Sequence, residues 1–135
     1  MLLQASSVGA GLVVHSLTKA IGGHGNALGG AVVDTGLFDW RGFPNILPAY
    51  TVGDPAGWGL LQIRKKGLRD FGASLRADDA HRIAVGAETL ALRVARTGES
   101  ALAVAGFLAG QPAVERVHYP GLPGHAQHAR ATELF

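Results

Sequence analysis

Two hydroxyl side chains and a primary amine lie within four consecutive residues near the start of the chain: Ser16, Thr18 and Lys19. Hydroxyl groups bind phosphate as neutral hydrogen-bond donors, and a lysine amine either pairs with an anion or attacks a carbonyl carbon as a nucleophile. A desolvated amine has a lowered pKa, which favours the neutral form that reacts. The grouping therefore suits an aldehyde cofactor that carries a phosphate tail.

The same residue types also occur together in ordinary polar loops, where the lysine is a solvated surface charge. A nucleotide-binding phosphate loop explains them less well, because the pattern GxxxxGK[ST] is absent and the glycines of residues 22–25 follow Lys19 instead of preceding it. His24 lies between glycines, and we expect it to orient the loop and not to catalyse. From these residues alone, a surface lysine and a cofactor lysine both remain open.

Two short β-branched runs must position these side chains. Residues 12–15 predict a buried strand that ends in a polar loop, and residues 31–33 predict a second buried strand. The twelve residues 19–30 include five glycines, so the connection is too short for a helical crossover and too rich in glycine for a helix. We therefore expect antiparallel strands with a functional loop at their tip.

The remaining sequence predicts helices and one further strand. In chain order we expect an irregular, packed segment at 35–55, helices at 58–71 and 77–110, a half-buried strand at 114–119 and the opening of a helix at 125–134. Apolar residues in 77–110 recur at three- and four-residue steps in two groups. We expect two helices there, bent or broken near Gly86 or Gly98.

The composition describes a packed globular protein. Of 135 residues, 47% are hydrophobic and 16% charged, and twelve basic against ten acidic residues give a net charge of +2. Basic residues are scattered except at 64–66, so no nucleic-acid partner is expected. The apolar start lacks a basic region and is interrupted by glycines, so neither a signal peptide nor a membrane partner is expected. The absence of cysteine favours a cytoplasmic location.

The six histidines raise the question of a metal site. His118, His125 and His128 gather near the end of the chain, but no acidic residue accompanies them at a matching spacing. We expect solvated or capping histidines there and no metal.

Four stretches of the chain resemble one enzyme family in the same order. They are residues 9–34, 67–73, 88–93 and 114–122. The first reads Gly-Ala-x-Leu-Val-Val-His-Ser-x-Thr-Lys-x-x-Gly-Gly-His-Gly-Asn, followed by Gly-Gly-x-Val-Val-Asp. Together they are similar to the Cys/Met-metabolism (trans-sulfuration) family of pyridoxal-phosphate enzymes. Residues 22–26, 36–40 and 68–72 most resemble its O-acetylhomoserine sulfhydrylase branch.

The resemblance implies an α/β fold that is part of a fold-type-I PLP-dependent transferase. Residues 1–75 would be the end of the large cofactor domain, and residues 76–135 the connecting helices and the start of the C-terminal small domain. Lys19 would form a Schiff base with pyridoxal 5′-phosphate, while Ser16 and Thr18 would hydrogen-bond its phosphate.

The reaction implied is replacement of an activated γ-substituent by sulfide, which gives homocysteine in methionine biosynthesis. The implied partners are an amino-acid substrate of the O-acetylhomoserine type, sulfide, and further copies of the chain in a homo-oligomer.

The family also has groups that this sequence does not match: a tyrosine stacked on the cofactor, an aspartate paired with the pyridine nitrogen, and an arginine that binds the substrate carboxylate. The aspartate matters because an unprotonated pyridine withdraws charge poorly. We therefore expect an internal fragment, either a gene fragment or an excerpt of a longer protein, that is inactive alone. The alternative is a non-catalytic remnant that only associates with a full-length relative.

Overall fold

The computed structural model describes residues 3–135. They form two compact units, one of residues 4–87 and one of residues 88–135 together with Leu3. The predicted loop of residues 19–30, which begins at Lys19, lies in the first unit. The domain boundary that the resemblance places between residues 75 and 76 stays a prediction.

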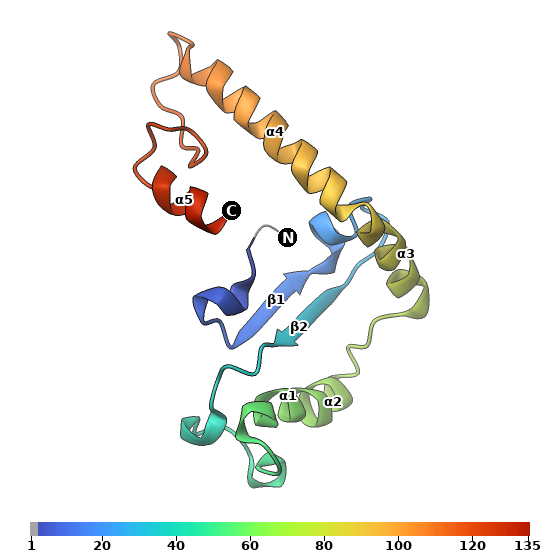
Figure 1. Ribbon diagram of the computed structural model, residues 1–135. Helices are drawn as coiled ribbons and strands as arrows, with labels where there is room; N and C mark the ends of the chain where they lie inside the picture. Colours follow the sequence, from blue (N-terminus) through green and yellow to red (C-terminus); the bar gives the residue numbers. More distant parts are fainter. Residues whose placement is uncertain (1–2) are drawn as a thin grey trace. The chain divides into compact units, whose positions relative to one another are not determined.

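The first unit is built on a two-stranded antiparallel sheet (Figure 1). Strand β1 (Leu12–Ser16) pairs with β2 (Gly30–Asp34) in a register that sets Ser16 opposite Gly30. Both strands and their antiparallel pairing were predicted correctly.

The prediction that these strands are buried is wrong. Val14 is 76% exposed, and Val32 and Val33 are 42% and 46% exposed. Val14 lies opposite Val32, and Val33 lies opposite Val13. Because neighbouring pairs along a ladder point to opposite faces, exposed valines occur on both faces of the sheet. A run of β-branched residues is typical of a strand whose side chains are packed against other elements. Among the described residues, no element packs over these valines.

The loop between the strands starts with η2 (Leu17–Ile21), a single π-helical turn. Helical structure was not predicted there. The turn comes before the glycines and is closed by a hydrogen bond of 2.9 Å from the Gly22 amide to the Leu17 carbonyl. After it, Gly23 and Gly25 have φ of 72° and 64°. Left-handed backbone of this kind favours glycine and ends the turn.

Residues 35–71 combine short turns with a helical segment. Besides η2 and a longer helix described below, the elements outside the sheet in the first unit are η1 (Ala5–Val8), η3 (Trp40–Gly42), η4 (Pro48–Tyr50), η5 (Pro55–Gly57), α1 (Trp58–Gln62), η6 (Ile63–Leu68) and α2 (Arg69–Phe71). The last three follow one another without a gap, which confirms the helix expected over 58–71. Trp40 is buried, with Phe38 and Phe43 set edge-on to its ring. Elsewhere in 35–55 most side chains are exposed, so the packing expected there is limited to the surroundings of Trp40.

Two helices occupy residues 77–109, as expected. Helix α3 (Ala77–Glu88) ends and α4 (Leu90–Ala109) begins on either side of Thr89. The break therefore lies near Gly86, whereas Gly98 is inside α4. Helix α5 (His128–Leu134) begins three residues later than the predicted start at 125.

The strand predicted at 114–119 is absent; these residues are irregular. A strand needs a hydrogen-bonded neighbour, and in the described part of the chain none is beside it.

Few side chains in residues 3–135 are buried. The buried hydrophobic residues are Trp40, Ile83 and Ala105. Many large apolar side chains are exposed, among them Leu28, Phe71 and Leu92 at 76%, 88% and 75%. Within residues 3–135, we find no helix that is both long and apolar enough to span a membrane.

Candidate functional site

Lys19 lies in η2, directly beyond the end of β1. Its backbone leaves helical geometry, with φ −86° and ψ −127°, inside the π-helical turn. The side chain is exposed. Within residues 3–135, no carboxylate lies within ion-pair distance of its amine and no acceptor is bonded to it. The amine is therefore available to a ligand.

Thr18 is half-buried, and its hydroxyl is bound to the backbone of Gly29. The Gly29 amide donates to Thr18 Oγ1 at 3.0 Å, and Thr18 Oγ1 lies 3.3 Å from the Gly29 carbonyl oxygen. That oxygen also accepts from the amides of Leu17 at 2.9 Å and Thr18 at 3.3 Å. A carbonyl oxygen has two lone pairs, so three donors exceed its capacity. The bond from the Thr18 hydroxyl, at 3.3 Å, is therefore weak, and its proton can turn to another acceptor at little cost while the oxygen keeps the bond from the Gly29 amide.

Ser16 is the last residue of β1 and is exposed. Its backbone is fixed by pairing with Gly30 in the sheet. In the described part of the chain its hydroxyl makes no hydrogen bond, so it can donate to a ligand without breaking an existing bond. Ser16, Thr18 and Lys19 together thus offer two hydroxyl protons and one amine, a donor set that fits a phosphorylated aldehyde.

The glycine-rich segment after Lys19 is held by its own side chains and backbone. His24 Nδ1 lies 2.7 Å from the Gly22 carbonyl oxygen, and because that oxygen can only accept, Nδ1 carries the proton. The Gly23 amide donates to the Lys19 carbonyl at 2.7 Å. His24 therefore orients the loop, as expected, through a bond within the loop.

Sequence reasoning missed the role of α3 in this site. Ile83 is 6% exposed, and Arg82 Nη1 donates to the Asn26 carbonyl at 3.2 Å. A Cβ atom built on Gly86 would collide with the Gly22 carbonyl. A small pocket lined by His24, Asn26, His81, Arg82, Val85 and Gly86 marks the same junction. A helix-interior glycine is costly, which singled out Gly86, but Gly98 carries the same cost and has nothing within 4 Å, so the sequence did not show which of the two is in close contact.

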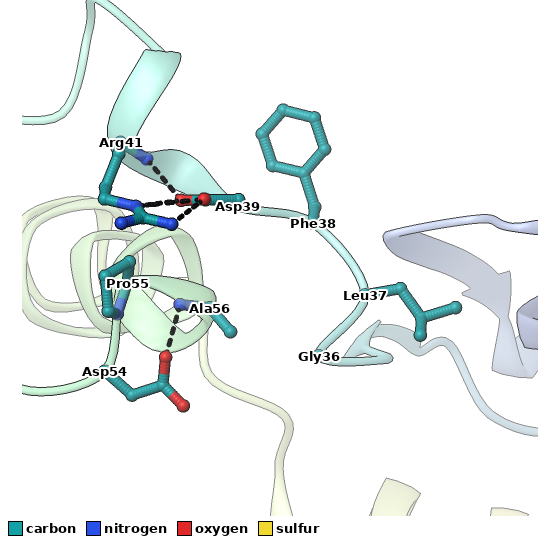
Figure 2. A pocket seen from close by; sticks show the side chains of 8 residues that line it. All are labelled: Gly36, Leu37, Phe38, Asp39, Arg41, Asp54, Pro55 and Ala56. Atoms are coloured by element: carbon teal, nitrogen blue, oxygen red, sulfur yellow. Dashed lines mark hydrogen bonds and ion pairs between the residues drawn. The ribbon is translucent and has the colours of Figure 1, made fainter.

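A second pocket, of about 280 Å³, lies around η3 and η5 (Figure 2). Asp39 accepts from the backbone amide of Arg41 at 3.0 Å and from its guanidinium, with Nη2 at 2.5 Å. The Arg41 guanidinium and amide lower the pKa of Asp39 to about 2. Asp54 accepts from the Ala56 amide at 2.9 Å. These polar groups cap short turns and are already paired, which leaves little capacity for a ligand.

The histidines near the end of the chain do not assemble a metal site. Among residues 3–135 there is no group of three or more histidine, cysteine, aspartate or glutamate side chains that could hold a metal ion. His128 Nδ1 lies 2.9 Å from the Pro120 carbonyl, and the Gln127 amide donates to His125 Nδ1 at 3.1 Å. Both imidazoles thus bond to nearby backbone.

Strand β1, the turn η2 with Lys19, the glycine-rich residues 22–30 and strand β2 form an α/β piece of the fold-type-I class of pyridoxal-phosphate-dependent enzymes. Similar solved structures include an O-acetylhomoserine sulfhydrylase of Wolinella succinogenes, with TM-score 0.83 and 35% identity over 98% of this chain and 37% of that one. The chain belongs to the family of Cys/Met metabolism PLP-dependent enzymes, which matches it over residues 1–135.

The relatives agree with the branch that the motifs indicated. O-acetyl-L-homoserine sulfhydrylase 1 of Thermus thermophilus is 42% identical over 146 residues, 99% of this chain and 34% of that protein. Homocysteine/cysteine synthase of Kluyveromyces lactis is 37% identical over 144 residues, 98% of this chain and 32% of that protein. The chain therefore spans about one third of the length of the curated relatives it matches.

One solved structure contains a cofactor-derived group. An O-acetylhomoserine (thiol)-lyase of Campylobacter jejuni, with TM-score 0.81 and 32% identity over 98% of this chain and 35% of that one, contains N′-pyridoxyl-lysine-5′-monophosphate. In that protein, the cofactor and a lysine are one covalent unit.

Proposed function

We propose that Lys19 is the residue through which this chain binds pyridoxal 5′-phosphate. The observation that carries the proposal is an exposed amine without a partner in the described chain, set beside the hydroxyls of Ser16 and Thr18. Nζ adds to the aldehyde carbon of the cofactor, a C=N bond forms, and the aldehyde oxygen leaves as water. The pyridoxyl-lysine group of the Campylobacter jejuni relative supports a linkage of this kind.

Ser16 and Thr18 would hold the phosphate. Ser16 donates its hydroxyl proton directly, and Thr18 donates the proton that the Gly29 carbonyl cannot fully use. Neutral donors of this kind orient a phosphate without adding charge beside the amine. They would thus set the direction from which the aldehyde approaches Nζ of Lys19.

When bound, the cofactor supplies a ring that stores negative charge developing at the substrate α carbon. The part left to this chain is proton transfer. Once its amine is released from the cofactor, Lys19 can accept a proton from carbon and return it, as a positioned general base and acid.

For a full-length protein that contains this sequence, we propose an O-acetylhomoserine sulfhydrylase-like activity. It would replace an activated γ-substituent by sulfide to give homocysteine, and act as a cytoplasmic homo-oligomer. The relatives' names and the 42% identity to the Thermus thermophilus sulfhydrylase support this substrate class. We expect the 135 residues alone to be inactive, because none of them matches the aspartate that pairs with the pyridine nitrogen or the arginine that binds the substrate carboxylate in the family.

A second function is favoured by the exposed apolar surface. Val14, Leu28 and Phe71 are 76%, 76% and 88% exposed. Such a chain could act without catalysis, by associating with a full-length relative through those surfaces. The two proposals differ in whether Lys19 binds the cofactor selectively.

The test is reductive labelling of the purified chain. Pyridoxal phosphate is added, the imine is reduced with borohydride, and the labelled lysines are mapped by peptide mass spectrometry. We expect label on Lys19 well above that on Lys65 and Lys66, which are exposed lysines of η6 and serve as internal controls. In Lys19→Arg, the label on the other two should not change. Equal labelling of all three lysines would contradict the proposal.

The activity of the chain is measured separately. We expect no homocysteine from O-acetylhomoserine and sulfide with the 135 residues alone. Turnover by the isolated chain would show that the unmatched groups are not needed.

A further inference from the structure

Helix α3 meets the loop after Lys19 at a point where only a glycine fits. A Cβ atom built on Gly86 would overlap the Gly22 carbonyl oxygen and lie 2.8 Å from its carbonyl carbon and 3.0 Å from its Cα. Both glycines are buried. Since the atoms met are backbone, they cannot move aside as a side-chain end would.

Two neighbours on the same helix extend this contact. A Cβ atom on Gly29 would lie 2.7 Å from Ile83 Cδ1, so Ile83 fills the space beside both ends of the glycine loop, with its Cγ1 3.7 Å from the corresponding position on Gly22. Arg82 Nη1 donates to the Asn26 carbonyl at 3.2 Å in the middle of the loop. Figure 1 shows α3 beside the loop that joins β1 to β2.

The contact is linked to Lys19 through two short backbone bonds. The Gly22 amide donates to the Leu17 carbonyl at 2.9 Å, and the Gly23 amide donates to the Lys19 carbonyl at 2.7 Å. A shift of Gly22 therefore disturbs the turn that carries the lysine. The same turn holds Thr18 against Gly29, so the direction of the amine and that of the hydroxyl depend on one packing contact.

We propose that Gly86 is a positioning residue for cofactor binding: its missing side chain lets α3 hold Gly22 where the turn aims Lys19 and Thr18 at one ligand. The inference rests on the proposed function of Lys19. It assigns part of the site to helix α3, which begins more than fifty positions after Lys19 in the sequence.

The main experiment compares Gly86→Ala with Gly98→Ala in the full 135-residue chain. Both changes add one methyl group inside a helix and raise helix preference, but a Cβ on Gly98 meets nothing within 4 Å. Pyridoxal phosphate and borohydride label is measured on Lys19 relative to Lys65 and Lys66. We expect Gly86→Ala to lower this ratio at least about tenfold, since small misplacements of reacting groups cost that much. Gly98→Ala should match the parent chain.

A second labelling reaction distinguishes a change in the orientation of the Lys19 amine from a change in its accessibility. Formaldehyde with borohydride methylates accessible lysines and does not need a phosphate site. If Gly86 positions the amine, methylation of Lys19 stays the same in Gly86→Ala while pyridoxal labelling falls. Unchanged pyridoxal labelling in Gly86→Ala would overturn the inference, and so would an equal fall of both labels.

Arg82→Gln covers the case in which Gly86→Ala unfolds, as judged by circular dichroism. Arg82 is exposed and contributes one bond to the loop, so the fold should survive and the Lys19 ratio should fall severalfold. No fall would overturn the inference.

If the parent chain itself shows no preference for Lys19, the proposed function fails, and hydrogen exchange then tests the structural part of the inference, that Gly86 lets α3 hold Gly22 in place. Faster exchange of the Gly22 and Gly23 amides in Gly86→Ala than in Gly98→Ala would support it, and equal exchange would overturn it.

Discussion

At the scale of single residues, the structure separates groups that are already paired from groups that can still act. Thr18 and Gly29 exchange hydrogen bonds, yet Thr18 keeps a proton to offer because the carbonyl it faces has three donors. Asp39 is the contrasting case, since the guanidinium and amide of Arg41 occupy its carboxylate. Residue type alone did not distinguish these cases, because each depends on what lies opposite the side chain.

Asp39 gives a pH prediction at this scale. Its pKa is lowered from 3.8 to about 2, first by the Arg41 side-chain hydrogen bond and then by the Arg41 amide. In Arg41→Gln we expect the carboxyl titration, followed by NMR, to move upward but to stay below the ordinary value, because the amide still donates. Arg64→Gln, a change in η6, should leave it in place.

The sign for stability follows from the same shift. The folded-state pKa lies below the unfolded one, so the contribution of Asp39 to folding is present above pH 3.8 and is lost as the pH falls toward 2. Both partners are largely exposed, so this contribution is small. An identical titration midpoint in the parent chain and Arg41→Gln would contradict the assignment.

At the scale of elements, two helices are held by glycines that admit a neighbour. Gly86 lets α3 reach the Gly22 carbonyl, and Gly59 lets α1 reach the ring of Trp40. Helical periodicity predicted that these segments are helices, because apolar spacing is a property of the segment itself. It did not predict which part of the chain each glycine would meet, since that depends on a distant residue.

Gly59 and Gly67 give a prediction for the segment α1–η6. A Cβ on Gly59 would lie 2.8 Å from Trp40 Cδ2 and closer to two other ring atoms, whereas one on Gly67 meets nothing within 4 Å. Gly59→Ala should lower the free energy of unfolding by about 1–3 kcal/mol through overpacking, partly offset by the helix preference of alanine, about 1 kcal/mol. Gly67→Ala should raise the free energy of unfolding by about 1 kcal/mol, because it gains the helix preference of alanine without overpacking.

The measurement is urea unfolding followed by tryptophan fluorescence. Trp40 should also shift its emission in Gly59→Ala, because the new methyl group displaces its ring. Equal stability of the two variants would show that the Trp40 contact does not restrain α1.

At the scale of the whole molecule, the described residues bury few of their apolar side chains. Trp40, Ile83 and Ala105 are the buried hydrophobic residues within 3–135, while Val14 and Phe71 are 76% and 88% exposed. Apolar surface of this extent favours association, because each area removed from water contributes to stability. The composition is that of a packed protein, but the contacts that would use it are not supplied by the residues described.

We expect the isolated chain to self-associate. Sedimentation velocity over a roughly hundredfold range of concentration should show a rising sedimentation coefficient, with binding of an apolar dye that falls as the chains associate. Added salt should not weaken the association, since apolar contacts are not screened. A monomer at every concentration without dye binding, or dissociation by salt, would contradict this expectation.

From the sequence alone we could predict the helices at 58–71 and 77–109, the antiparallel pair of strands, the family and the lysine proposed for the cofactor. These depend on periodicity, turn residues and motif order, which are read along the chain. Only the three-dimensional structure shows that α3 contacts the loop after Lys19 through Gly86, that both faces of the sheet carry exposed valines, and that residues 114–119 form no strand. A strand or a buried face exists only when another segment supplies its hydrogen bonds and its cover, and the pattern of one segment does not contain that partner.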